Sequence, residues 1–133
     1  MAEQGIWWRL QPFIDDEDAI PFPEGSANRQ TQPHMVNGTD TLFNARLASR
    51  QGRQLANLVR WHAPAEALAM ATGSNGELLL LSGPRNPYPG RIGVVAEGAL
   101  ADLLLVDGDP TANIRLTEDP ARNFLIIMKD GRV

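Results

Sequence analysis

The sequence predicts a mixed α/β protein with a helical middle and a last third made of short strands. From Leu47 onward, apolar residues recur at spacings that fit one face of a helix. From about residue 91, short apolar runs alternate with glycine-containing turns, which is the pattern of strands. A chain of 133 residues is long enough to form one hydrophobic core.

The overall composition limits the classes of function. Hydrophobic residues make up 43% of the chain and charged residues 21%, which indicates a globular protein. The net charge of −4 gives no basic surface, so we expect no nucleic-acid partner. No apolar run approaches the roughly 18 residues of a membrane span, and no signal peptide is visible. The compartment is left as unknown, with the cytoplasm as the default for a soluble chain. The absence of cysteine excludes thiolate chemistry but leaves a zinc site of histidines and carboxylates open.

Residues 1–46 are rich in turn-forming residues around one apolar burst at 6–10. This burst is short and aromatic, and Gly5 and Pro12 bound it, so it predicts a strand. The acidic run at 15–18 is followed by proline and glycine, which favours a solvated loop. It lacks the alternation and the terminal glutamate of a calcium-binding loop.

Three helices are predicted in the middle of the chain. The first runs from Leu47 to about Trp61, because Pro64 disfavours helix in the residue before it. Pro64 then suits the first turn of a second helix over 65–71. Residues 74–77 match a capping box, which predicts a third short helix over 78–81 that Gly83 ends.

The last third predicts strands at 91–94, 102–106 and 124–128. The second of these is a continuous apolar run, as expected of a strand buried on both faces. Glu97-Gly98 predicts a turn, and residues 129–132 are a strong two-residue hairpin signal. Asp102 stands just before the apolar run, so a turn or capping role is favoured over a catalytic one.

Several linked pieces of the second half resemble the end of the amidohydrolase superfamily, in its imidazolonepropionase-like and prolidase-like branch. Their order and spacing carry the resemblance, which extends more weakly upstream to residues 1–13. The pieces are Pro64-Ala65-Glu66-Ala67-Leu68 with Ala71-Thr72, Gly90-Arg91-Ile92-Gly93, Glu97-Gly98-Ala99-Leu100-Ala101-Asp102-Leu103, Leu105-Val106-Asp107-Gly108-Asp109-Pro110 and Ile127-Met128-Lys129-Asp130-Gly131-Arg132.

The resemblance implies a C-terminal piece of a (β/α)8 barrel joined to part of a small β-sandwich. Residues 1–82 would hold about strands seven and eight and the last barrel helices, and residues 83–133 the partial sandwich. We therefore expect the sequence to be a fragment of a longer protein.

For the whole family, the resemblance implies hydrolysis of amide, peptide or cyclic C–N bonds through a metal-bound hydroxide, usually on zinc. The substrate would be a small-molecule amide or a dipeptide. The family's ligands include a His-x-His pair and two further histidines, whereas this chain has only His34 and His62. We expect the chain alone to bind no metal and to be inactive.

Asp40 is the one candidate for a catalytic and metal-binding residue. In Gly38-Thr39-Asp40, it resembles the aspartate that ends barrel strand eight, which binds metal and shuttles a proton. Residues 33–37 do not read as a buried strand and look more like the seventh helix of relatives, where a similar triplet occurs. A plain loop or cap aspartate remains the alternative.

Other conspicuous residues favour structural roles. His34 follows Pro33 in a polar loop and is interpreted as a surface histidine, and His62 as a packing or helix-end residue. Trp7 and Trp8 favour core packing over substrate stacking, and residues 86–89 favour a rigid connection.

Two other functions stay open. The chain could be one half of a split enzyme completed by a separate N-terminal chain, or a non-catalytic interaction module that pairs through a sheet edge. Open edges would also favour self-association. No phosphate-binding glycine loop is present.

Overall fold

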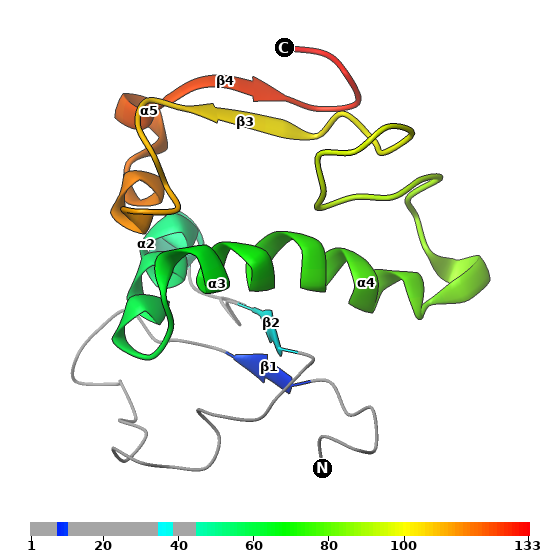
Figure 1. The fold of residues 1–133 in the computed structure, drawn as a ribbon, viewed down its shortest axis with the longest axis horizontal. Helices are drawn as coiled ribbons and strands as arrows, with labels where there is room; N and C mark the ends of the chain where they lie inside the picture. The colour runs from blue at the N-terminus through cyan, green and yellow to red at the C-terminus, as the bar shows by residue number, and fades with distance from the viewer. Residues whose placement is uncertain (1–7, 11–34, 39–44) are drawn as a thin grey trace.

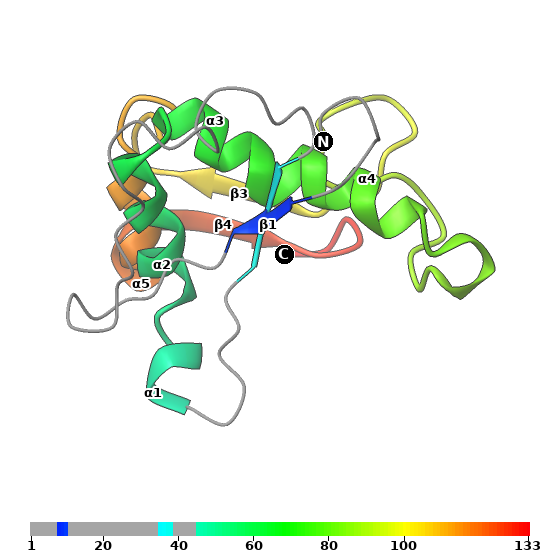
Figure 2. The ribbon, with the colours of Figure 1, turned by 90° about the horizontal axis from the view of Figure 1, so that it is seen from below.

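The computed structural model describes residues 8–10, 35–38 and 45–133 (Figure 1). Figure 1 shows a long helical rod with one two-stranded sheet on each side of it. The two pairs are separate two-stranded sheets. In Figure 2, the strands of the first pair cross the rod, and those of the second run beside it. The predicted mixed α/β class is confirmed at this level.

The first pair of strands is parallel. Strand β1 (Trp8–Leu10) pairs with β2 (Met35–Asn37), with Trp8 opposite Met35 and Leu10 opposite Asn37. The strand predicted at 6–10 is confirmed for its described residues. The interpretation of residues 33–37 as helix is wrong for the part described, because Met35–Asn37 hydrogen-bonds to β1 as a strand.

The predicted helix from Leu47 to Trp61 is confirmed in broken form. It comprises α1 (Ala45–Ala48), α2 (Gln51–Asn57) and a 3₁₀ turn, η3 (Leu58–Arg60). Between α1 and α2 the Ser49 hydroxyl donates to the Arg46 carbonyl at 2.9 Å. This local bond competes with the helical ladder and accompanies the break.

The next helices form one rod rather than two separate helices. α3 (Pro64–Ala69) passes into a π-helical segment, η4 (Met70–Ser74), and then into α4 (Asn75–Leu80). Pro64 occupies the first turn, as predicted. The predicted capping box is wrong: Ser74 has helical backbone angles and its side chain caps nothing, because the chain reaches it already wound as a helix.

The rod ends where the sequence indicates. The helix stops at Leu80, and Gly83 has φ of +55°, a conformation that favours glycine. A 3₁₀ turn, η5 (Gly83–Arg85), leads into an extended connection. The strand predicted at 91–94 is wrong: Arg91 makes only an isolated bridge to Ala99, and Gly93 at φ +78° breaks the extended backbone.

The second sheet is antiparallel and lies near the C-terminus. β3 (Leu103–Val106) pairs with β4 (Phe124–Met128), and η6 (Ile114–Glu118) and α5 (Pro120–Asn123) lie between them in sequence. The predicted hairpin at 129–132 is confirmed, because Lys129 and Arg132 exchange both backbone hydrogen bonds. The predicted turn at Glu97-Gly98 is also present.

The hydrophobic core lies between the helices and η6. Its buried residues come from α2, η3, α3, η4 and η6, and they are Ala56, Leu58, Ala67, Met70 and Ile114. The Thr117 hydroxyl of η6 donates to the Gly52 carbonyl of α2 at 3.0 Å. The core therefore joins residues from both sides of the predicted boundary at residue 82, which itself stays a prediction.

The burial predicted for the 102–106 strand is wrong in this structure. Leu103, Leu104 and Leu105 of β3 are all exposed. A sheet of only two strands, with no helix layer packed closely over either face in the described part of the chain, cannot bury a strand on both sides. No helix within the described ranges is long and apolar enough to cross a membrane.

Candidate functional site

If the parallel strands belong to a barrel, active-site residues are expected at their C-terminal ends. Parallel strands bring their C-terminal ends to one edge, where the loops that follow them carry active-site residues. Leu10 and Asn37 are register partners at this edge, and the buried Gly38 follows β2 directly. The π-helical segment η4 packs against β2, and in Figure 1 β2 lies beside the helical rod.

The residues singled out from the sequence flank β2 in the chain. Asp40 comes three residues after Asn37, the last residue of β2, and His34 immediately precedes Met35, the first. Both Asp40 and His34 lie outside the described residues, as does Trp7. Their roles therefore stay predictions.

His62 joins two helical segments. Its side chain is 10% exposed, and its Nδ1 lies 3.8 Å from Glu66 Oε2. Its backbone N–H donates to the Leu58 carbonyl at 2.9 Å, and Glu66 Oε2 also accepts from the Ala63 N–H at 3.0 Å. His62 thus lies at the junction of η3 and α3, in agreement with the predicted packing role.

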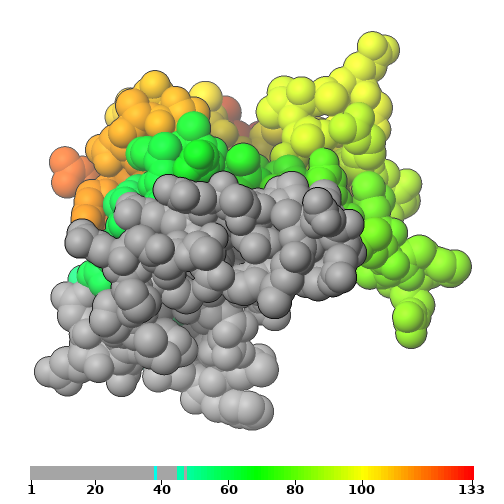
Figure 3. Space-filling view, turned by 60° about the horizontal axis from the view of Figure 1, so that its bottom comes forward, coloured from blue at the N-terminus to red at the C-terminus, as the bar shows by residue number. Residues whose placement is uncertain are grey.

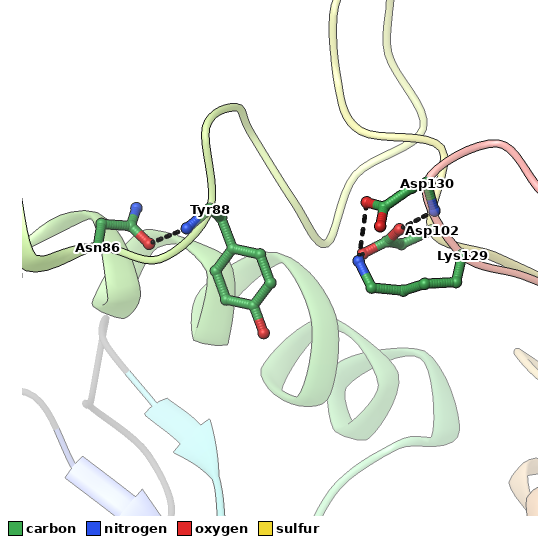
Figure 4. Close-up of polar contacts among 5 residues, drawn as sticks. All are labelled: Asn86, Tyr88, Asp102, Lys129 and Asp130. Carbon is green, nitrogen blue, oxygen red and sulfur yellow. Dashed lines mark hydrogen bonds and ion pairs between the residues drawn. The ribbon is translucent and has the colours of Figure 1, made fainter.

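A polar cluster fixes the C-terminal hairpin (Figure 4). The Asp102 carboxylate accepts from the Asp130 backbone N–H at 2.8 Å through one oxygen and from Lys129 Nζ at 2.8 Å through the other. Lys129 Nζ also donates to the Asp130 carboxylate at 3.0 Å and lies 5.7 Å from the centre of the Tyr88 ring. Asp102 therefore has a capping role, one of the two roles predicted, but it caps a hairpin turn 28 residues away rather than a local turn. The cluster ties the start of β3 to the turn after β4.

The hydrogen bonds within this cluster favour the charged forms of Asp102 and Lys129. The hydrogen bond from the Asp130 backbone, followed by that from Lys129, lowers the pKa of Asp102 below its usual value. The hydrogen bonds to Asp102 and Asp130 raise the pKa of Lys129. Both Asp102 carboxylate oxygens and Lys129 Nζ have hydrogen-bond partners within the cluster, so the arrangement is that of a structural clamp.

A second exposed carboxylate, that of Asp109, makes hydrogen bonds within the loop after β3. Asp109 Oδ1 accepts from the Thr111 hydroxyl at 2.6 Å and from the Thr111 N–H at 2.8 Å, and these bonds lower the pKa of Asp109. The bond between Asp109 and Thr111 was not predicted from the sequence. An Asp followed two residues later by Thr is the signal that identifies such a turn.

The described residues do not supply a metal site. Among them, no three histidine, aspartate or glutamate side chains gather closely enough to hold an ion. The one buried side-chain atom found there without a hydrogen-bond partner is Gln54 Oε1, a single amide oxygen on α2. The donor set in this part of the chain therefore does not fit the zinc centre that the resemblance implies.

Among the comparisons with known proteins, those with solved structures found similar proteins. No protein-family model matches the chain, and no curated protein matches it significantly. A solved amidohydrolase matches with a TM-score of 0.61 at 31% sequence identity, over 74% of this chain and 22% of its own. A prolidase solved in complex with N-methylphosphonate-L-proline matches with a TM-score of 0.60 at 27% identity, over 73% of this chain and 22% of its own.

A third solved structure, of an uncharacterised protein, matches with a TM-score of 0.59 at 27% identity, over 73% of this chain and 21% of its own. The chain thus spans about a fifth of the length of the structures it matches. The resemblance seen in the sequence is confirmed: over about three-quarters of its length, this chain is similar to part of amidohydrolase and prolidase-like proteins.

Proposed function

We propose that this chain is the C-terminal part of a metal-dependent amidohydrolase that hydrolyses amide, peptide or cyclic C–N bonds. The parallel pairing of β1 with β2, followed by helices, supports a barrel piece in residues 1–82. The antiparallel β3–β4 pair supports a sandwich piece in residues 83–133. The matched prolidase, solved with a proline-derived phosphonate, favours a dipeptide as the substrate.

Asp40 is the residue of this chain that we propose for the chemistry. The observation that carries it is the parallel strand β2, because Asp40 follows its C-terminal end by three residues in sequence. This is where barrel enzymes carry catalytic residues. Since residues 35–37 are a strand and not a helix, the argument that the Gly38-Thr39-Asp40 triplet belongs to a helix no longer applies to them.

Asp40 would bind the metal and hold the proton that moves during hydrolysis. A divalent ion, when bound, polarises the scissile carbonyl and makes water a stronger nucleophile. No three histidine, aspartate or glutamate side chains of the described residues form an ion site, so we propose that further ligands come from the complementary part of the fold. On this proposal the chain alone has no activity.

A chimaera tests the proposal. Residues 1–133 would replace the matched fifth of the solved amidohydrolase in one continuous chain, and hydrolysis and zinc content would be measured. We expect Asp40→Asn to lower kcat by about 10²-fold or more, the usual size of a lost general acid–base group. Asp107→Asn, on an exposed residue after β3, is the matched control and should leave kcat unchanged.

Two results would contradict the proposal. One is an active chimaera whose kcat is insensitive to Asp40→Asn. The other is a zinc content near one or two ions per molecule in the isolated, unfused chain, which would mean that the chain builds a site by itself.

A further inference from the structure

The chain has several bonds at which an aspartate or asparagine is followed by glycine. They are Asn37-Gly38, Asn75-Gly76, Asp107-Gly108 and Asp130-Gly131. At such a bond the backbone nitrogen of the glycine can attack the side-chain carbonyl carbon of the residue before it, because glycine has no Cβ to hinder the approach. The attack is fastest where this nitrogen has no hydrogen-bond partner and the backbone can move. The folded structure therefore decides which of these bonds reacts.

Both bonds that follow asparagine lie in regular backbone with a buried glycine. Asn37 is the last residue of β2, and Gly38 after it is buried. Asn75 begins α4, its side-chain amide donates to the Ala71 carbonyl at 3.3 Å, and Gly76 is buried. Backbone of this kind reaches the geometry of attack only through local unfolding, so these two bonds are protected.

The bond between Asp130 and Gly131 is exposed, but its reacting groups are engaged. The Gly131 N–H, which is the attacking group, donates to the Ala101 carbonyl at 3.0 Å. The Asp130 carboxylate accepts from Lys129 Nζ at 3.0 Å, and the Asp130 N–H donates to the Asp102 carboxylate at 2.8 Å. These hydrogen bonds hold the nucleophile and its target in place.

The bond between Asp107 and Gly108 is exposed, and its reacting groups are free. Both residues are exposed and directly follow β3. The Asp107 N–H donates to the Asn123 carbonyl at 2.8 Å, but the Asp107 carboxylate and the Gly108 N–H take part in no hydrogen bond among the described residues. Gly108 has φ of +117°, which glycine adopts readily. Figure 3 shows the orange segment that follows β3 at the surface of the molecule.

We propose that the bond between Asp107 and Gly108 is a modification site, at which the folded chain converts aspartate into isoaspartate without an enzyme. The reactants are the chain itself and water. The modification is independent of the hydrolysis proposed above, because it involves neither Asp40 nor a metal.

The conversion has two steps. In the first, the Gly108 nitrogen forms a bond to Cγ of Asp107, and the N–H hydrogen leaves with a carboxyl oxygen as one water molecule. The product is a five-membered succinimide ring. In the second, water opens this ring at one of its two carbonyl carbons. Cleavage of the bond from nitrogen to Cγ restores aspartate, whereas cleavage of the bond from nitrogen to the backbone carbonyl carbon gives isoaspartate.

The test compares the two Asp-Gly bonds within one chain. The purified protein is kept warm at neutral pH for several weeks and then digested, and isoaspartate is located by electron-transfer mass spectrometry. Because the hydrogen bonds at Asp130-Gly131 must break before attack, we expect at least about tenfold more isoaspartate at Asp107 than at Asp130. In urea this protection disappears, so the two bonds should react at similar rates.

Variants at the two positions identify the chemistry. Asp107→Glu keeps the charge but requires a six-membered ring, which forms more slowly, so it should remove the isoaspartate that follows β3. Asp130→Glu is the matched control and should leave the reaction at Asp107 as it was. Asp107→Asn enters the same succinimide with loss of ammonia instead of water, and should form isoaspartate at least tenfold faster. Freshly purified Asp107→Asn still carries asparagine, so its use as a charge control is unaffected.

Circular dichroism before and after incubation checks that each protein is folded, and the sample in urea shows that the assay detects both bonds. Two results would overturn the proposal. One is equal isoaspartate at Asp107 and Asp130 in the folded chain. The other is a folded chain that forms none at Asp107 while the chain in urea does.

Discussion

The helical part of this chain and its C-terminal sheet contain equally apolar residues but bury them very differently. Leu58 and Ile114 are each 1% exposed in the helical core, whereas Leu104 and Ile127 of the sheet are more than half exposed. Hydrophobic stabilisation scales with the apolar area removed from water. The comparison teaches that an apolar run predicts burial only if the chain also contains the layer that covers it.

The core is closed by a segment distant in sequence. Ile114 of η6 packs among residues of α2, η3 and α3, and the Thr117 hydroxyl bonds to the Gly52 carbonyl. Gly52 permits this contact, because a Cβ there would lie 1.8 Å from the Thr117 carbonyl oxygen. The sheet has no such closing segment in the described part of the chain.

Replacing one isoleucine in each region should give the largest difference in the free energy of unfolding. Ile114→Ala removes a fully buried side chain and should lower the free energy of unfolding by about 3 kcal/mol. Ile127→Ala, on the exposed face of β4, should change it by less than about 0.5 kcal/mol. Urea unfolding of the two variants measures both values, and equal losses would show that the sheet is as well packed as the core.

The close approach of α2 and η6 gives the next largest effect. Gly52→Ala forces the backbone of Thr117 to move and should destabilise the chain by about 2 kcal/mol. Gly73→Ala is the matched control, because a Cβ there would meet its nearest neighbour at an ordinary 3.7 Å and its backbone is helical. Thermal unfolding distinguishes the two, and an equal decrease in Tm would contradict the role assigned to Gly52.

Local signals in the sequence predicted much of this fold. Pro64 at a helix start, Gly83 at a helix end and Asp130-Gly131 in the hairpin all act through neighbouring backbone geometry, so the sequence alone identifies them. The errors arose where distant contacts decide. Ser74 lies inside a rod that packs against β2, and residues 35–37 become a strand only by pairing with β1.

Less of the candidate site than of the fold could be predicted from the sequence. The structural roles of Asp102 and His62 follow from their positions next to a strand and between helices, and both are found in the structure. The buried contact of Thr117 with Gly52 was not predicted, because it joins residues 65 positions apart. Asp40 stays a prediction, since it lies outside the described residues.

The clamp at the hairpin should give a small, pH-dependent effect, which hydrogen exchange at the hairpin measures directly. Because the pKa of Asp102 is lowered on folding, its stabilisation is present above the unfolded pKa of about 3.9 and is lost as pH falls through the lower folded value. The pKa of Lys129 is raised, so its contribution is present below about 10.4 and is lost as pH rises through the higher folded value.

Between these limits, Asp102→Asn should speed hydrogen exchange of the Asp130 amide and remove its acid dependence, because asparagine keeps an acceptor but not the charge for Lys129. Asp107→Asn, at the opposite end of β3, should leave the exchange of that amide as it was. An unchanged acid profile in Asp102→Asn would show that the carboxylate does not fix the hairpin.

Native-state hydrogen exchange of the isolated chain is the most direct test of the difference between the two regions. We predict that amides around Leu58 in the core exchange only through global unfolding, with a free energy that matches the one from urea. Amides of β3 and β4 should exchange through local opening, with a clearly smaller free energy. Equal protection in the two regions would mean that the sheet is complete by itself, and would contradict the claim that it lacks a covering layer.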